Sequence, residues 1–453
     1  MTIGGAAMVT DSIATMAAAD EQRQSRRAWV MLVALSLAFA CSTLDRIVIS
    51  LLVEPIKADL GLTDTQFSLL QGLAFLLVYS LSGILIGLLV DRINRCKLIG
   101  VGVALWSLMT GLCGLARSFW QLFLARAGVG IGEATLSPAA FSLIVDMFPR
   151  SKHGVALGLY SAGGVIGGCL ALMAGGTLIS SLAARGVQQL PIIGAVQPWQ
   201  MTFFLLTLPG LVIAAIFFVL REPTRTTGVA SPTAGYFDNP QLRAFYATNK
   251  SLLLRHHVAV GLCNLGLLGA LSWLPSLFIR VHGWDVGDIG IAAGLCYMAG
   301  GLAGLIGGGA VGDYVLRFGP ATRLTICAIS TAGAAVCAVI YPLADSPHVA
   351  MVAFGGFMMC GSLPLGVANA ALQMVVHGSI RGVVSSIYYL VLSLVAILGP
   401  TLIAVLADRV FPEQTGIRYA TAIVLGLTAA VSTALFLWVT PAYRRRAASA
   451  ARA

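Results

Sequence analysis

The chain of 453 residues is too apolar for a soluble protein, because 58% of its residues are hydrophobic and only 10% are charged. A soluble domain carries about a quarter charged residues, so most of this surface must face lipid. The net charge of +10 would favour nucleic acid in a soluble protein. In a membrane protein it reflects Lys and Arg in cytoplasmic loops, and we expect no nucleic-acid partner.

Nine cysteines and six histidines show no metal-ligand spacing. No CxxC occurs, and we interpret the cysteines as buried free thiols. His256 and His257 are neighbours, and adjacent side chains on a helix diverge by about 100°, so we do not expect a ligand pair. We predict neither a metal nor a cofactor.

Residues 1–27 are polar and Ala-rich, and we predict a disordered cytoplasmic tail without a cleavable signal peptide. Beyond them lie twelve apolar segments, each near the 20 or so residues that a spanning helix needs. They are 28–53, 67–90, 98–116, 120–145, 154–178, 202–220, 258–279, 289–311, 324–343, 349–376, 383–407 and 420–439. The predicted fold class is therefore an all-α polytopic membrane protein.

Charge predicts the orientation of these spans. With the N-terminus in the cytoplasm, twenty Lys and Arg residues lie inside and six outside, while Arg46 and Arg126 lie within spans. Such a bias is typical of cytoplasmic loops. We therefore expect both termini in the cytoplasm, which requires an even number of spans.

The longest predicted cytoplasmic segment, 221–257, divides the spans six and six, and its Pro, Thr, Gly and Ser residues favour a linker. We expect an N-terminal six-helix bundle over 28–220, a C-terminal bundle over 258–440 and a basic cytoplasmic tail over 441–453.

A repeated motif supports this division. The pattern G-x-x-x-D-x-x-x-R follows both span two and span eight, 222 residues apart, which indicates a duplication. We interpret it as a cytoplasmic gate, in which Gly admits a neighbouring helix and Asp complements a helix N-terminus. A purely structural loop clamp is the alternative. The gate residues are Gly87, Asp91, Arg92 and Arg95 in the first copy and Gly309, Asp313 and Arg317 in the second.

The twelve spans, the central linker and this motif resemble the major facilitator superfamily, whose fold pairs two pseudo-symmetric six-helix bundles. Family loops usually read D-R-x-G-R-[RK], and here Asn94 replaces the Gly while Cys96 precedes Lys97. Two segments resemble the Spinster branch: Leu44-Asp45-Arg46 in span one, and a stretch from Arg126 to Ala134 containing Gly-Val-Gly-Ile-Gly-Glu-Ala. The resemblance implies a proton-linked carrier.

Four charged residues, Asp45, Arg46, Arg126 and Glu133, lie within spans of the first half. A charge near the bilayer centre costs about 2.5–3.5 kcal/mol or more, so we expect function, with structural pairing as the alternative. Asp45 lies about 12 Å and Arg126 about 9 Å below the outer ends of their spans. We therefore expect these two to meet. Glu133, seven residues after Arg126, lies on the same face about 10 Å deeper.

These positions suggest roles. Glu133 has no oppositely charged sequence neighbour and becomes the first proton-coupling candidate, with Asp45 the second. Arg46 and Arg126 suit an anionic group of the substrate, because guanidinium matches carboxylate and phosphate. A proton that reaches a carboxylate would free its Arg for the substrate, which couples the two movements.

The second half offers only neutral polar and aromatic side chains inside its spans. Each alone is more often a packing residue than a ligand contact. As a set they predict a weakly polar cavity wall, formed by Asn264, Trp273, Tyr297, Asn369, Gln373, Tyr388 and Tyr389.

The sequence thus predicts a secondary active transporter, proton-coupled, for a small organic anion or an amphipathic anion. A Spinster-type lysolipid or sphingoid exporter is the alternative within transport, and a transporter-like receptor or sensor the alternative outside it. We predict no enzyme, because no GxSxG, HExxH or clustered His and Asp occurs. Substrate, protons and the bilayer are the expected partners of a monomer in a bacterial inner membrane.

Overall fold

The computed structural model describes residues 4–90, 92–191, 193–223, 225, 240–377 and 380–450. Twelve helical segments in this part of the chain are long and apolar enough to cross a membrane, which confirms the predicted fold class. Backbone groups in lipid must bond within their own segment, so apolar runs of this length become helices.

The first half contains spans one to six. Its elements are α1 (Gly4–Leu51), α2 (Val53–Leu60), α3 (Asp64–Gln71), the π-turn η1 (Gly72–Leu77), α4 (Val78–Val90), α5 (Arg95–Leu115), α6 (Phe119–Glu133), α7 (Leu136–Met147), η2 (Arg150–Lys152), α8 (His153–Arg185), β1 (Gln188–Leu190), β2 (Gly194–Val196) and α9 (Pro198–Val219). Strands β1 and β2 form an antiparallel hairpin between spans five and six. Span four is interrupted directly after Glu133, where α6 ends.

The second half contains spans seven to twelve. Its elements are α10 (Pro240–Leu277), η4 (Phe278–His282), α11 (Val286–Leu302), η5 (Ala303–Gly307), α12 (Gly308–Tyr314), η6 (Val315–Phe318), α13 (Thr322–Leu343), α14 (Pro347–Val375), α15 (Arg381–Ala396), α16 (Leu398–Val410), η8 (Gln414–Gly416) and α17 (Ile417–Ala450).

Three helices extend past the predicted spans. Helix α1 begins at Gly4, within the expected disordered tail; α10 begins at Pro240, within the expected linker; and α17 runs to Ala450, within the expected basic tail. Hydropathy locates only the part of a helix inside lipid, while Ala-rich flanks continue the helix because Ala has the highest helix propensity.

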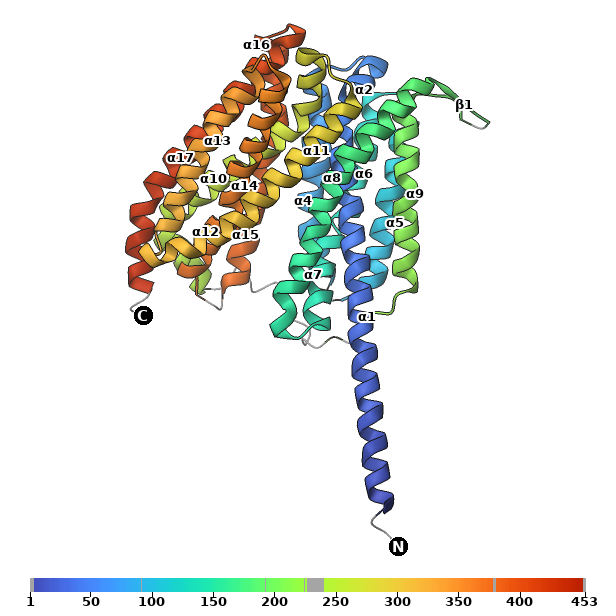
Figure 1. The fold of residues 1–453 in the computed structure, drawn as a ribbon, viewed down its shortest axis with the longest axis vertical. Coiled ribbons are helices and arrows are strands. Elements are labelled where there is room, and N and C mark those ends of the chain that lie inside the picture. The colour runs from blue at the N-terminus through green and yellow to red at the C-terminus, as the bar shows by residue number, and fades with distance from the viewer. Residues whose placement is uncertain are drawn as a thin grey trace.

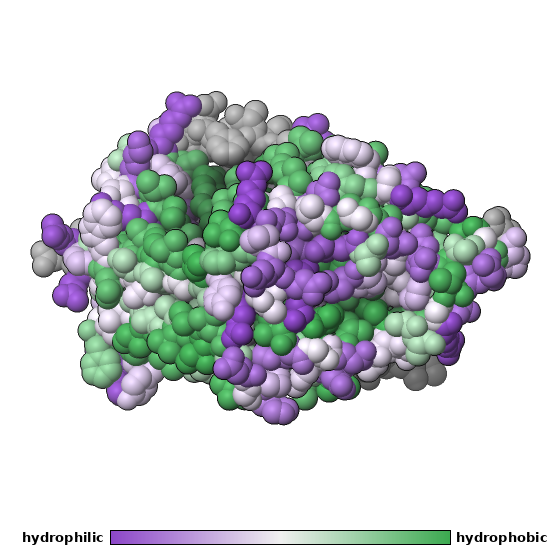
Figure 2. Space-filling model, turned by 90° about the horizontal axis from the view of Figure 1, so that it is seen from above, coloured by the Kyte–Doolittle hydropathy of each residue, from purple (hydrophilic) through white to green (hydrophobic). Residues whose placement is uncertain are grey.

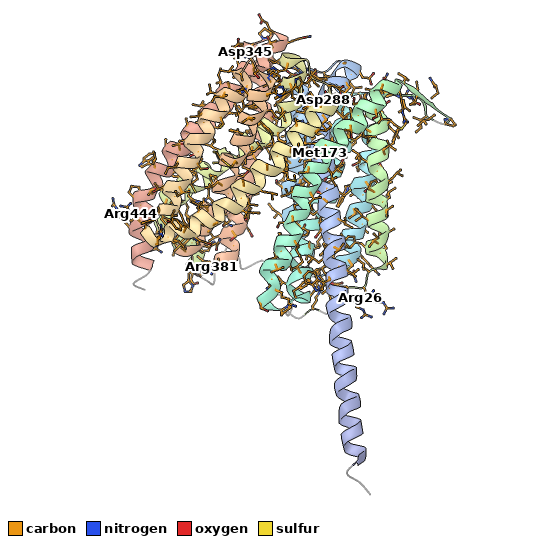
Figure 3. The ribbon with its side chains drawn as sticks, viewed as in Figure 1. Arg26, Met173, Asp288, Asp345, Arg381 and Arg444 are labelled. Atoms are coloured by element: carbon orange, nitrogen blue, oxygen red, sulfur yellow. The ribbon has the colours of Figure 1, made fainter. Side chains whose placement is uncertain are left out.

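The two halves lean together at one end of the molecule and diverge toward the other (Figure 1). Both chain ends lie at the divergent end, called here the termini end, and the β1–β2 hairpin lies at the opposite hairpin end. Arg26, Arg381 and Arg444 mark the termini end, and Asp288 and Asp345 the hairpin end (Figure 3).

Glycines bring α8 of the first half against α11 of the second. A Cβ added to Gly176 would lie 2.8 Å from the carbonyl oxygen of Val286, and one added to Gly168 would lie 2.7 Å from the ring of Tyr297. Small residues of this kind let helix backbones approach closely in membranes. The α8–α11 contact is therefore a tight packing interface between the halves.

Ion pairs join the halves at the hairpin end. The Arg280 guanidinium of the second half binds Glu54 at 2.8 Å and Asp64 at 2.7 Å, both in the first half. Nearby, Asp408 accepts hydrogen bonds from the backbone and the hydroxyl of Thr65. Hydrophilic residues gather over the middle of this face (Figure 2). This network closes the hairpin end.

Candidate functional site

Inside the first half, Arg46 of α1 pairs with Glu133 at the end of α6. The Arg46 Nε atom lies 2.5 Å from Glu133 Oε2, which also accepts a hydrogen bond of 2.7 Å from Ser42. Glu133 is 1% exposed, whereas the side chain of Arg46 keeps 25% exposure. The guanidinium of Arg46 is therefore partly accessible while it binds a buried carboxylate. It can exchange that carboxylate for an anionic ligand, or release it when the carboxylate gains a proton.

Asp45 points to a different helix. Its Oδ2 atom accepts a hydrogen bond of 2.7 Å from Thr110 of α5, and its Oδ1 atom has no hydrogen-bond partner among the described residues. No salt bridge joins Asp45 to Arg126 among the described residues. Arg126 is nevertheless the charged group that interacts most strongly with the Asp45 carboxylate, so the two lie near each other without direct contact. Depth along a helix does not fix direction around it: α1 turns Arg46 toward α6 and Asp45 toward α5.

Arg126 is buried without an acceptor for most of its donors. It is 1% exposed, and neither Nε nor Nη1 has a hydrogen-bond partner within the described residues. Its guanidinium carbon instead lies 4.9 Å from the ring centroid of Phe75. An unsatisfied buried guanidinium is costly, and an anion would satisfy it.

Two aromatic residues of span two complete the cluster, and sequence reasoning missed both. Phe75 lies in the π-turn η1, and its ring centroid is 5.1 Å from the guanidinium carbon of Arg46. The Tyr79 ring lies 4.4 Å from the same carbon. Phe75 thus packs against both Arg46 and Arg126. The available signal was an aromatic pair four residues apart, the spacing of one helix face.

The glycines of span four let the neighbouring helices reach this cluster. A Cβ on Gly130 would lie 2.7 Å from the carbonyl oxygen of Phe75, and one on Gly132 would lie 2.7 Å from the backbone nitrogen of Trp106. Only glycine, which has no Cβ, allows the neighbouring helix backbones to come this close. The Gly128-x-Gly130-x-Gly132 run therefore packs helices around Glu133.

The gate motif is only partly assembled. Asp91 lies outside the described residues, and a Cβ on Gly87 or Gly309 would meet no atom within 4 Å. The expected close helix approach at these glycines is thus wrong in this conformation, because the halves diverge at this end. Arg92 is exposed.

The arginines of the two motif copies behave differently. Arg95 is buried and binds Asp146 of α7 at 2.6 Å and Glu222, at the start of the predicted linker, at 2.7 Å. Arg317 lies over the ring of Tyr314, and Asp313 pairs with Arg323 at 2.6 Å. The described contacts of the first copy thus join α5 to α7 and to the segment after α9, and those of the second copy join α12 to α13.

The residues proposed as the cavity wall of the second half separate into two groups. Trp273 and Tyr388 are fully buried, and Trp273 donates to the carbonyl of Pro400, so these two do not reach an open cavity here. The others are half-buried or exposed, namely Asn264, Tyr297, Asn369, Gln373 and Tyr389.

Among them, Asn369, Gln373 and Tyr389 form one hydrogen-bonded network. Asn369 donates to Tyr389 at 3.1 Å, and the Gln373 amide donates to Asn369 at 3.3 Å and to Ser385 at 2.8 Å. The network lies toward the termini end of α14 and α15, where each helix faces its neighbour.

The rings of His256 and His257 meet, although no metal-ligand pair is predicted for them. Their Nδ1 atoms lie 3.4 Å apart, and both rings pack against Tyr388. Adjacent Cβ atoms diverge, but side-chain rotation brings the rings together. Within the described residues, no three His, Cys, Asp or Glu side chains gather as metal ligands.

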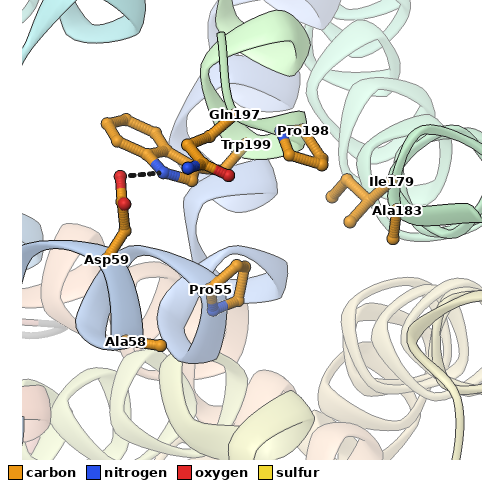
Figure 4. Close-up of a pocket in the computed structure, with 8 residues that line it drawn as sticks. All are labelled: Pro55, Ala58, Asp59, Ile179, Ala183, Gln197, Pro198 and Trp199. Atoms are coloured by element: carbon orange, nitrogen blue, oxygen red, sulfur yellow. Dashed lines mark hydrogen bonds between the residues drawn. The ribbon is translucent and has the colours of Figure 1, made fainter. Parts of the chain in front are cut away.

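An open pocket of about 380 Å³ lies at the hairpin end, away from the charged cluster (Figure 4). Trp199 forms part of its wall and donates a hydrogen bond of 2.9 Å to Asp59. Asp59 is exposed and already partnered, so the chemistry points to the charged cluster rather than to this pocket.

A family model decides which family this architecture represents. The model described as Major Facilitator Superfamily matches residues 35–400. The chain belongs to the major facilitator superfamily. An MFS-type efflux pump of Mycolicibacterium smegmatis is 26% identical, over 93% of this chain and 94% of its own length. A probable L-galactonate transporter of Escherichia coli K12 is 27% identical over 75% of each chain.

The Spinster resemblance is also confirmed. The crystal structure of a bacterial homolog of the human lysosomal transporter Spinster, in an inward-facing and occupied conformation, matches with a TM-score of 0.73 and 26% identity. The match covers 93% of this chain and 96% of that one. This superfamily member is therefore an integral membrane transporter with a small-molecule substrate.

Proposed function

We propose that this transporter moves a small organic anion together with protons across a bacterial inner membrane, by alternating access between its halves. The observation that carries this proposal is Arg126, buried with unpartnered donors beside the Arg46–Glu133 pair. Guanidinium groups suit carboxylates. The similarity to a probable L-galactonate transporter supports an organic anion.

The termini end is assigned to the cytoplasm. Twenty Lys and Arg residues on that side against six on the other support the assignment. The Arg280 ion pairs then close the outer face, and the halves diverge toward the cytoplasm. The similarity to an inward-facing structure supports the same orientation.

Coupling follows from competition for Arg46. An ionised Glu133 occupies the Nε edge of Arg46 at 2.5 Å, so a substrate carboxylate must compete with it. A proton bound by Glu133 removes the competing charge and frees the guanidinium for the substrate. Asp45, held by Thr110, is the second proton site. The substrate passes unchanged through a monomer, with no catalytic step.

Export of a lysolipid or sphingoid anion is the second candidate. The similarity to a Spinster homolog supports it, as do the rings of Phe75 and Tyr79 beside the guanidinium of Arg46. These rings can contact an apolar group attached to the anion.

Uptake and efflux by proteoliposomes, with and without an inward proton gradient, test the proposal. Sugar acids and a lysophospholipid serve as substrates. We expect wild-type protein to accumulate a sugar acid only with the gradient, and Arg126→Gln to abolish the accumulation. Arg409→Gln, an exposed arginine of α16, is the matched control. Gradient-independent movement of every substrate, or a fully active Arg126→Gln protein, would contradict the proposal.

A further inference from the structure

A basic and aromatic surface lies on the second half, remote from the charged cluster. Arg255 of α10 places its guanidinium carbon 3.6 Å from the ring centroid of Trp438 of α17. Trp438 is 62% exposed, so this contact is on the outside of the protein rather than in its core. An indole and a guanidinium stacked at a protein surface form a cation–π pair.

A further basic residue lies on the same face of α17. Arg445 follows Trp438 by seven residues, which returns to within about 20° of the same face, about 10 Å farther toward the helix end. Arg445 is exposed. We call Arg255, Trp438 and Arg445 the basic rim.

The helices that present the basic rim are rigidly joined. Phe245 and Leu252 of α10 share a buried cluster with Tyr443 and Ala447 of α17. Tyr443 also donates a hydrogen bond of 2.8 Å to the carbonyl of Ala371. The positions of Arg255 and Arg445 relative to each other are therefore fixed by packing.

Apolar residues continue from the basic rim toward the hairpin end. Val431 and Leu427 precede Trp438 on α17 by seven and eleven residues, which returns both to within about 20° of its face. Val431 is 40% exposed and Leu427 is 62% exposed. In a membrane-spanning bundle such residues face acyl chains. A surface with cations and an indole at its end, followed by apolar residues, matches a lipid, whose charged head and apolar tails have the same order.

We propose that the basic rim binds an anionic phospholipid of the adjoining leaflet, with the phosphate between Arg255 and Arg445 and the acyl chains along Val431 and Leu427. Charge complementarity selects an anionic lipid over a zwitterionic one. The apolar residues select a lipid over free phosphate. The site does not depend on the proposed substrate, because it lies outside both the Arg46–Glu133 pair and the interface between the halves.

Thermal unfolding of the purified transporter in detergent, with phosphatidylglycerol, phosphatidylcholine or inorganic phosphate added, tests the site. We expect phosphatidylglycerol to raise the unfolding midpoint above the other two. In the Arg255→Gln/Arg445→Gln protein at least half of that difference is lost. Native mass spectrometry of the same samples should show one phosphatidylglycerol fewer retained by the double variant.

The matched control is Lys97→Gln/Lys152→Gln, which removes the same charge from exposed positions of the first half. It should keep the phosphatidylglycerol effect. Arg255→Lys keeps the charge but loses the planar stack on Trp438, and should bind more weakly than wild type. The proposal is overturned if phosphatidylglycerol raises the unfolding midpoint of the double variant as much as that of wild type. It is also overturned if the control pair loses as much of this rise as the double variant, or if phosphatidylcholine or phosphate raises the wild-type midpoint as much as phosphatidylglycerol does.

Discussion

The two halves share one fold, but their interiors differ in charge. The first half buries Asp45, Arg126 and Glu133 beside Arg46. In the second half, the described ion pairs lie near the ends of the bundle: that of Arg323 toward the termini end, and those of Arg280 and Arg418 toward the hairpin end. We therefore infer that the ion chemistry of the proposed transport cycle belongs to the first half.

The duplication shows how complete this division is. Moved by the 222 residues that separate the two motif copies, Asp45, Arg46, Arg126 and Glu133 fall on Leu267, Leu268, His348 and Gly355. Phe75 falls on Tyr297, another aromatic residue. The second half thus has an aromatic ring at that position but no carboxylate and no arginine at the four charged positions. We infer that it serves as the less charged surface against which the first half moves.

After Arg126→Gln, Glu133→Gln should have the largest effect, because it removes the titrating partner of Arg46. We expect proton-driven uptake to fall by about 100-fold, in line with the cost of truncating one partner of a buried charge pair. Exchange of substrate without a gradient should persist. Radiolabelled uptake in proteoliposomes measures both, with Glu413→Gln, an exposed loop carboxylate, as control. Normal proton-driven uptake would refute the division of labour.

Arg280→Gln should come next, since it severs the contact of the neutral half with Glu54 and Asp64. Breaking a partly buried pair leaves the carboxylates uncompensated, and we expect the population open at the hairpin end to rise by about 10-fold or more. Distances between spin labels at Ala58 and Pro412 report the opening. Arg409→Gln, also in the second half at this end, should leave the distances unchanged.

Phe75→Leu should have a moderate effect, because it removes one ring from two guanidinium groups. A cation–π contact contributes about 0.5–2 kcal/mol, and we expect KM for the anion to rise about fivefold. Phe75→Tyr should restore most of the affinity. Tyr297→Leu, the counterpart in the second half, should change KM less; an equal change would erase the contrast between the halves.

Gln373→Leu should have the smallest effect, since hydrogen bonds between membrane helices contribute about 0.6 kcal/mol on average. We expect the rate of substrate uptake in proteoliposomes to change less than threefold. The control Glu413→Gln should change this rate by a similarly small factor. A loss as large as that of Glu133→Gln would show that the Asn369–Gln373–Ser385 network takes part in transport directly.

The spans and the four buried charges could be predicted from the sequence because lipid imposes strong rules on length and charge. The side chains that each charged residue contacts could not be predicted in this way. Adjacent residues on α1 face different helices, so the choice between Asp45 and Arg46 for span four depended on the rotation of α1. Phe75 and Tyr79 escaped notice because an aromatic ring in an apolar span resembles ordinary packing.

The empty space at Gly87 and Gly309 has a consequence for mutational surveys. A side chain added there meets nothing in this conformation, so a folding or melting assay should report a neutral change. In the proposed alternating access, the opposite conformation brings the termini ends of the two halves together, and we expect the same side chain to collide there. Such substitutions would leave the melting temperature unchanged and lower only the rate of transport. A survey that measures the stability of one conformation would therefore misclassify them as benign.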